Sequence, residues 1–159
     1  MTRNGYLAGA VCAIAILLGS SAQARDKDCG QPFKGHSSGT IVTSGAPPII
    51  HIVFSGPAHL SGLGLSQIVF PHDWNLINKS VTGFMTITAA NGDELYAVVT
   101  GTAVPVVPGT LALNQTGTFT GGTGRFDDAE GSFSIIGTVV GNAVNVVMDG
   151  CLKRDRRCD

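Results

Sequence analysis

Apolar and polar residues alternate along most of the chain after residue 24, in short runs separated by turn residues. Residues 131–140 are a clear case, since serine and threonine lie between Phe133, Ile135 and Val139. A period of two residues places the apolar side chains on one face of a half-buried β-strand. The pattern predicts eight strands, over residues 36–42, 49–55, 63–70, 81–89, 94–102, 110–120, 131–140 and 143–149.

Turn signals separate these strands at roughly ten-residue spacing, which is typical of antiparallel sheets. Asn91-Gly92 joins residues 81–89 to 94–102, and both residues tolerate the positive φ of a type I′ hairpin turn. Gly141-Asn142 joins the last two strands in a similar way. We also expect a bulge or a barrel corner at Gly117, and a loop over residues 71–75, which begin with Pro71.

Composition and the exposed-edge problem together predict the fold class. Valine, isoleucine and threonine pack well on a pleated surface, and they supply 36 of the 135 residues after residue 24. Eight short antiparallel strands hide their edges most completely by closing into a barrel. We therefore predict an all-β fold, an eight-stranded antiparallel up-and-down β-barrel over residues 35–150. The interior of such a barrel is either filled by side chains or holds one small apolar ligand.

The first 24 residues have the organisation of a secretory signal peptide. Arg3 precedes an apolar run over residues 6–18, and Ala22-Gln23-Ala24 forms a cleavage site. The run is shorter than the roughly 20 apolar residues of a membrane span, which disfavours the alternative of an uncleaved anchor. We predict a signal-peptide helix cleaved after Ala24 and a secreted or periplasmic product without stable membrane insertion. Residues 25–34 are then a lead-in, and residues 151–159 a basic C-terminal tail.

The charge of the mature chain argues against nucleic acid as a partner. Removing residues 1–24 removes Arg3 alone among the charged side chains, which leaves a net charge of −2. Nucleic-acid binding depends on neutralising phosphates with Lys and Arg, and this balance does not favour it. The basic run over residues 153–157 is short and interrupted by Asp155, so we interpret it as a solvated tail.

Three cysteines remain after cleavage: Cys29, Cys151 and Cys158. An oxidising compartment allows one disulfide among them and leaves one thiol over. Cys29 precedes the first predicted strand and Cys151 follows the last, so a bridge between them would join the two ends of the barrel and close a loop of over 100 residues. We favour Cys29–Cys151 for this reason; Cys151–Cys158 is the alternative, with a smaller loop and less to gain.

Three segments carry a family resemblance: residues 56–62 (GPAHLSG), 89–95 (AANGDEL) and 120–131 (TGGTGRFDDAEG). Over residues 35–149 their order and spacing resemble bacterial exported proteins with an allene oxide cyclase-like barrel. The third segment also resembles the G-G-T-G-x-F-x-x-A-x-G segment of plant dirigent proteins, which share that barrel. The resemblance implies an eight-stranded barrel, often a homotrimer, with a central cavity for a hydrophobic molecule. The catalytic positions of the plant enzymes find no residue-by-residue match here, so none is carried over.

The third segment is most simply structural. Its glycines give the backbone freedom for a tight connection between two strands, and the absence of G-K-[ST] excludes a phosphate-binding loop. We expect Arg125 to pair with Asp127, Asp128 or Glu130 across this turn, and weigh a structural role against contact with a ligand. Asp93 is expected to serve the preceding turn, because Asp bonds nearby backbone.

Recognisable catalytic and metal-binding patterns are missing from the sequence. There is no G-x-S-x-G nucleophile elbow and no H-E-x-x-H zinc motif. If the protein is an enzyme, Glu130 and His59 are the candidate catalytic residues, since a cyclase needs a tuned carboxyl group. The spacing of His36, His51, His59 and His72 fits no metal site, so we expect no metal and no cofactor.

The candidate ligand-binding residues are His59, Trp74, Tyr96 and Arg125. His59 lies in the first segment near a strand end, and Trp74 is placed to cover a barrel mouth. Trp74 and Tyr96 each combine a large apolar ring with a polar tip.

These observations leave three hypotheses for function. The leading one is a non-catalytic exported barrel that binds a small hydrophobic molecule in or at the mouth of the barrel. The second is an isomerase or cyclase that acts on an apolar substrate inside the barrel. The third is a structural or surface interaction protein with a filled barrel.

Overall fold

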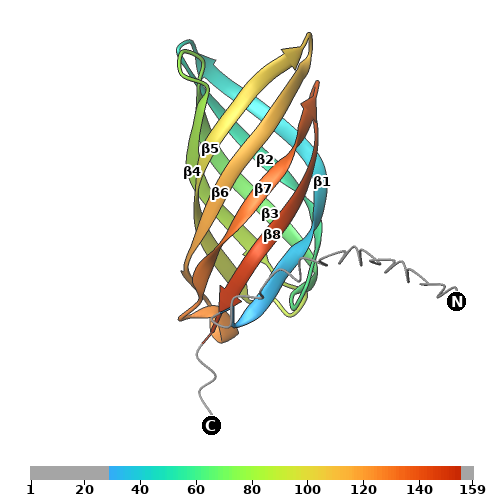
Figure 1. The fold of residues 1–159 in the computed structure, drawn as a ribbon, viewed down its shortest axis with the longest axis vertical. Coiled ribbons are helices and arrows are strands. Elements are labelled where there is room, and N and C mark those ends of the chain that lie inside the picture. Colours follow the sequence, from blue (N-terminus) through green and yellow to red (C-terminus); the bar gives the residue numbers. More distant parts are fainter. Residues whose placement is uncertain (1–28, 155–159) are drawn as a thin grey trace, which may run out of the picture.

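The computed structural model of the chain describes residues 29–154, which form one closed antiparallel barrel (Figure 1). Each strand pairs with the next along the chain, and β8 pairs with β1. The predicted all-β, eight-stranded up-and-down barrel is confirmed. The expected signal peptide, its cleavage site and Cys158 lie outside the described residues. The strands are β1 (Gln31–Ala46), β2 (Ile49–Leu60), β3 (Gly64–Asn75), β4 (Ser80–Thr88), β5 (Glu94–Val107), β6 (Thr110–Gly122), β7 (Glu130–Val140) and β8 (Ala143–Lys153), with a short 3-10 turn, η1 (Gly124–Phe126), between β6 and β7.

Several strands are longer than the sequence pattern predicted. β1 has 16 residues and begins at Gln31, and β8 continues to Lys153, so the barrel extends into residues expected as lead-in and tail. The alternation continues through these extensions, with Phe33 and Leu152 buried beside exposed Lys34 and Lys153.

The prediction of a loop over residues 71–75 is wrong, because this segment is the last part of β3. His72 pairs with Ile52 of β2 and with Gly83 of β4, and Trp74 pairs with Ile50 and Val81. Pro71 fits within β3 because it has no partner residue on β4. The N–H group that proline lacks therefore costs no hydrogen bond between these two strands.

The connection between β4 and β5 is longer than a two-residue hairpin turn. Of the Asn91-Gly92 pair, Gly92 alone has a positive φ, at 88°, so the type I′ turn predicted here is wrong. The side chain of Asn91 instead accepts a hydrogen bond from the backbone N–H of Asp93 at 3.3 Å. Gly141, with φ of 59°, opens the two-residue turn between β7 and β8.

The predicted bulge at Gly117 is also wrong. Gly117 pairs in regular register with Val99 and Phe133. The two register shifts between β5 and β6 fall elsewhere, between Leu95 and Ala97 and between Pro105 and Val107. Position 117 requires glycine for a different reason, since a Cβ there would collide with the ring of Phe133.

The two ends of the barrel are built differently. One end, which we call the closed end, carries the start of β1, the end of β8, η1 and the connections 61–63, 89–93 and 123–129. The other, which we call the open end, carries the connections 47–48, 76–79, 108–109 and 141–142. The closed end is packed by Phe33, Phe119 and Phe133, whose ring centroids lie 4.8 to 5.0 Å apart. The fully buried ring of Phe126 in η1 completes this packing.

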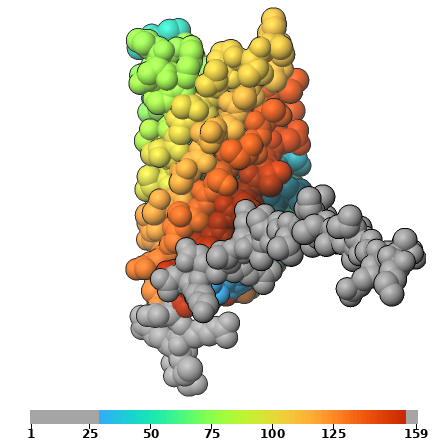
Figure 2. All heavy atoms as spheres, viewed as in Figure 1, coloured from blue at the N-terminus to red at the C-terminus, as the bar shows by residue number. Residues whose placement is uncertain are grey.

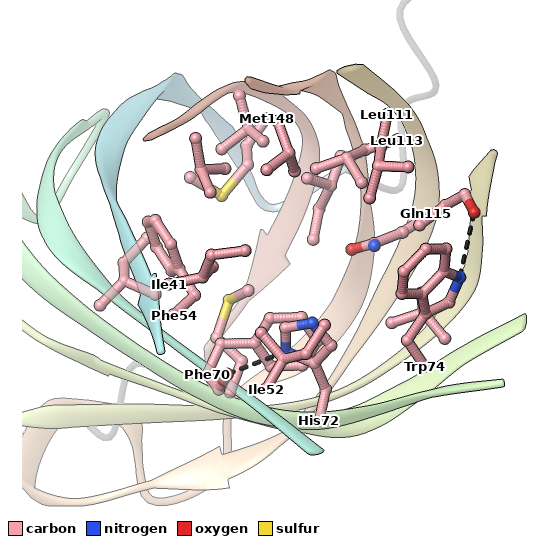
Figure 3. A pocket seen from close by; sticks show the side chains of 18 residues that line it. Ile41, Ile52, Phe54, Phe70, His72, Trp74, Leu111, Leu113, Gln115 and Met148 are labelled. Carbon is pink, nitrogen blue, oxygen red and sulfur yellow. Dashed lines mark hydrogen bonds between the residues drawn. The ribbon is translucent and has the colours of Figure 1, made fainter. Parts of the chain in front are cut away.

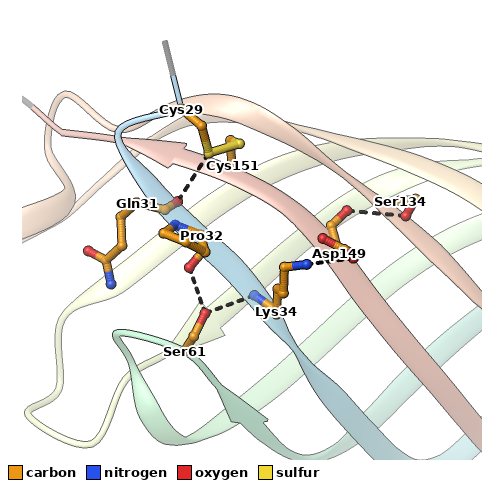
Figure 4. A network of polar contacts seen from close by, with 8 residues as sticks. All are labelled: Cys29, Gln31, Pro32, Lys34, Ser61, Ser134, Asp149 and Cys151. Atoms are coloured by element: carbon orange, nitrogen blue, oxygen red, sulfur yellow. Dashed lines mark hydrogen bonds and ion pairs between the residues drawn. A yellow bond between two sulfur atoms is a disulfide. The ribbon is translucent and has the colours of Figure 1, made fainter. Parts of the chain in front are cut away.

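A disulfide joins the segment just before β1 to the last strand, β8, at the closed end (Figure 4). Cys29 is bonded to Cys151, which confirms the predicted pairing. Beside it, the Ser61 hydroxyl donates to the carbonyl of Pro32 at 2.6 Å and accepts the backbone N–H of Lys34 at 2.8 Å. These bonds attach the connection after β2 to β1.

The side wall formed by β4 to β8 is continuous in the face shown in Figure 2. Because β8 also pairs with β1, the wall closes on itself, and the interior opens toward the ends of the barrel. Within residues 29–154 no helix has the length and hydropathy needed to cross a membrane.

Candidate functional site

The open half of the barrel contains a cavity of about 50 Å³ (Figure 3). Strand alternation produces it, because every second residue of a barrel strand faces the interior. Phe33, Phe119 and Phe133, which pack the closed half, are absent from the lining of this cavity. Its wall is formed by aliphatic side chains and methionine together with a few aromatic rings, among them Ile41, Ile52, Phe54, Phe70, Leu111, Leu113 and Met148.

A wider space of about 650 Å³ lies at the open end and forms a mouth for this cavity. The mouth is bordered by the connections after β5 and β7, through residues such as Pro108 and Asn142. The cavity and the mouth are contiguous, because they share lining residues from five strands. The residues that line both are Ile41, Ile52, Trp74, Leu111 and Val139.

Trp74, one of the candidate ligand-binding residues, lies where the cavity meets the mouth. Its indole N–H donates to the carbonyl of Ala103 on β5 at 3.1 Å, which fixes the ring in the wall (Figure 3). The apolar face of the ring is left to border the cavity. Trp74 is the only tryptophan of the chain, so its fluorescence reports on this site alone.

His72 also faces the cavity, two residues before Trp74 on β3. Its Nδ1 lies 2.9 Å from the carbonyl oxygen of Phe70, and its ring stacks on the Phe70 ring with centroids 4.2 Å apart. A carbonyl can only accept, so Nδ1 carries the proton and Nε2 of the neutral ring is an acceptor. Burial lowers the pKa of His72 below its ordinary value, against the opposing effects of the Phe70 carbonyl and Asp73.

Gln115 of β6 is the third polar side chain in the cavity wall, and it is 4% exposed. Its cross-strand partners are Gly101 and Ile135, neither of which has a polar side chain. Figure 3 shows its amide directed into the lumen. No carboxylate, lysine or arginine lines the cavity, whose wall lies wholly within the described part of the chain.

His59, a predicted ligand-binding and catalytic candidate, lies on the outer face of β2. Its side chain is exposed and stacks on His36 of β1, with ring centroids 5.3 Å apart. The structure does not bring it to the cavity. The same alternation that buries Ala58 and Leu60 directs His59 outward.

Tyr96 and Glu130 also lie apart from the cavity. Tyr96 follows buried Leu95 on β5, and its hydroxyl donates to the carboxylate of Glu94 at 2.6 Å. This hydrogen bond raises the pKa of Tyr96, because deprotonation would place a phenolate against a carboxylate. Glu130 is exposed at the start of β7, at the closed end.

Arg125 lies in η1 at the closed end, where it pairs with Asp93, an acidic residue outside the three expected for it. Its Nε is 3.6 Å from a carboxylate oxygen of Asp93, in the connection after β4, and its backbone N–H bonds to the same oxygen. Its guanidinium also lies 4.8 Å from the centre of the Phe126 ring. Asp93 thus attaches the glycine-rich segment to the neighbouring connection, which gives Arg125 a structural setting.

The remaining histidines do not assemble into a metal site. His51 lies on the outer face of β2 and is 2.5 Å from Asp73 of β3. Across residues 29–154, no three His, Cys, Asp or Glu side chains lie close enough together to hold a metal ion.

Sequence reasoning named Trp74 but missed His72 and Gln115. The signal for both was the alternation itself. Positions 68, 70, 72 and 74 share one face of β3, and positions 111, 113 and 115 share one face of β6. Because Pro71 was interpreted as the start of a loop, the alternation was not followed to His72 and Trp74 on β3.

No protein-family model, no curated protein and no solved structure matches this chain.

Proposed function

We propose that this protein is exported and that its barrel binds a small hydrophobic molecule at the open end, without catalysing a reaction. The observation that carries the proposal is the apolar cavity of about 50 Å³ that continues into a mouth of about 650 Å³. A ligand that covered this apolar surface would gain roughly 25 cal/mol per Å² removed from water.

The dimensions favour an elongated ligand. The mouth is within the range of about 300–1,000 Å³ that small-molecule sites occupy. The inner cavity accepts a narrow group equal to a few water molecules in size. A narrow end of the molecule would therefore enter the cavity, and the rest of the molecule would fill the mouth.

Binding is favoured over catalysis by the chemistry of the lining. His72 is the one titratable side chain that faces the cavity within the described residues, and it has no carboxylate beside it there. Glu130 and His59, on which an isomerase or cyclase hypothesis depended, lie at the closed end and on the outer wall.

Export is supported by the sequence of residues 1–24 and by the Cys29–Cys151 disulfide, since disulfides persist in oxidising compartments. Membership of the allene oxide cyclase-like or dirigent-like barrels remains part of the proposal. It is supported by the barrel topology and by the three sequence segments. In the structure the second and third segments meet at the closed end, where Thr123 and Asp93 join them.

Titration with diphenylhexatriene, a hydrocarbon dye that fluoresces in apolar surroundings, tests the binding proposal. We expect saturable binding to the chain from residue 25 onward, together with quenching of the Trp74 emission. Ala103→Leu fills the cavity and is expected to weaken binding by about ten-fold, equivalent to about 1.4 kcal/mol. Val104→Leu enlarges the next side chain, which faces outward, and serves as the matched control. Dye that does not saturate, or that binds Ala103→Leu as tightly as the native chain, would overturn the proposal.

A further inference from the structure

The amide of Gln115 has no hydrogen-bond partner in the described part of the chain, although the residue is 4% exposed. Within residues 29–154, every side-chain N or O atom that is fully buried has a hydrogen-bond partner. The Gln115 amide therefore borders the open space of the cavity, as Figure 3 shows. Leaving a buried amide unpaired costs free energy, and a leucine at this position would avoid that cost.

A second polar atom faces the same cavity from β3. The Nδ1–H of His72 is engaged by the Phe70 carbonyl, which leaves Nε2 with a lone pair and without a partner in the described chain. The nearest charged group in sequence, Asp73, points to the outer face and is paired with His51. The ring thus presents an acceptor to the lumen.

Together the two side chains offer complementary hydrogen-bonding groups in an otherwise apolar cavity. The Gln115 amide supplies N–H donors, and His72 Nε2 supplies an acceptor. One hydroxyl group satisfies both, because it donates one hydrogen bond and accepts others. A carboxylate would accept from the Gln115 amide, but it cannot donate to Nε2, and no cationic side chain lines the cavity to neutralise its charge.

We propose that the ligand of this barrel is an uncharged hydrophobic alcohol, whose hydroxyl donates to His72 Nε2 and accepts from the Gln115 amide. This inference rests on the proposed function and specifies the class of molecule that the open end selects. The apolar body of the ligand provides most of its binding, and the hydroxyl provides the selection.

Three probes with the same ten-carbon chain test the proposal: decanol, decyl methyl ether and decanoate at about pH 8, where the carboxylate is ionised. Each is titrated against diphenylhexatriene bound to the native chain. Decanol is expected to displace the dye at a concentration about ten-fold lower than its methyl ether, which lacks the O–H donor. Decanoate is expected to be at least about ten-fold weaker than decanol.

Variants separate the two contacts. Gln115→Leu should weaken decanol and its ether equally, by about five-fold, and leave the affinity for the hydrocarbon dye unchanged. His72→Phe should remove the difference between the alcohol and the ether. Gln67→Leu changes an exposed glutamine on the outer face of β3 and is the matched control. Gln115→Met replaces Gln115→Leu if the leucine variant does not fold.

The outcomes distinguish the two proposals. If the dye does not bind, the proposed function fails and the alcohol proposal fails with it. If the dye binds but decanol, the ether and decanoate displace it equally, the cavity is apolar without selection, and the alcohol proposal alone is overturned. Equal effects of Gln115→Leu and Gln67→Leu would overturn it as well.

Discussion

Phe133 of β7 lies across Gly117 of β6. The two residues are partners in the β6–β7 register, and the Phe133 ring occupies the position that a side chain at residue 117 would take. From there the ring packs against Phe33 and Phe119, which completes the aromatic cluster of the closed end. The solid packing of one half of the barrel thus depends on the absence of a side chain in the neighbouring strand.

Gly117→Ala is therefore expected to destabilise the protein. The added methyl group forces the Phe133 ring out of its position, and overpacking of this kind costs about 1–3 kcal/mol. Urea denaturation measures the free energy of unfolding. Thr118→Ala, at the next and outward-facing position, should change it by less than about 0.5 kcal/mol. A Gly117→Ala variant as stable as the Thr118→Ala control would contradict the packing described here.

Loss of the Cys29–Cys151 bridge is expected to lower stability strongly. The bridge spans 122 residues, and a loop of that length corresponds to an upper value of about 4–5 kcal/mol in the chain-entropy model. Cys151→Ser, compared with the oxidised native chain by denaturant unfolding, should show most of this loss. Cys158→Ser should leave the unfolding curve unchanged. Equal losses in the two variants would mean that Cys151 pairs with Cys158 instead.

Phe126, and not Arg125, is expected to hold the closed end together. Phe126 is fully buried, and its truncation to alanine should cost about 3–5 kcal/mol. Arg125 is partly exposed and forms one ion pair with Asp93 at 3.6 Å, so Arg125→Ala should cost no more than about 1 kcal/mol. Thermal unfolding of both variants compares the two losses of stability. A larger loss for Arg125→Ala than for Phe126→Ala would refute this division of roles.

His72 is expected to make stability depend on pH. Burial holds its pKa in the folded chain below the ordinary value of 6.5, so below about pH 6.5 the unfolded chain binds more protons at this residue. The free energy of unfolding contributed by His72 is therefore complete above that pH and falls as the pH decreases toward the folded-state pKa. His72→Phe removes this contribution. Denaturation at about pH 7.5 and about pH 5 should show a smaller decrease for the variant than for the native chain, and equal decreases would contradict the assignment.

The barrel could be predicted from the sequence because the pattern that specifies each strand lies within a few neighbouring residues. Alternation such as that of Phe133, Ile135 and Val139 fixes a strand and its inner face without reference to the rest of the chain. The disulfide was predictable for a related reason, since an up-and-down barrel brings its first and last strands together.

The contacts that the sequence did not reveal are those between residues far apart along the chain. The pairing of Arg125 with Asp93 was not foreseen, because Asp93 is 32 residues away and is brought close by the pairing of β5 with β6. Gly117 was interpreted as a bulge or corner of the backbone, whereas glycine is required there by the Phe133 ring on the neighbouring strand. Neither fact is contained in the local sequence.

The candidate site was predicted in kind but not in detail. Trp74 was placed at a barrel mouth, although the loop assumed to carry it is a strand. His59 and Tyr96 were chosen for their chemistry and without regard to which face of a strand they occupy, and both face outward. Applying the alternation strictly would have placed His72 and Gln115 inside.

The most direct test of binding at the open end is an NMR titration of methyl groups with diphenylhexatriene, whose aromatic rings shift nearby resonances. We expect saturable shifts at Ile41, Ile52 and Leu113, which line the cavity. Leu60, Leu95 and Leu152 at the closed end, and Val42 on the outer face, are internal controls that should remain unchanged. Shifts confined to Val42 and other outer-face methyls, or no saturable shift at any methyl group, would contradict the assignment of the open end as a ligand-binding site.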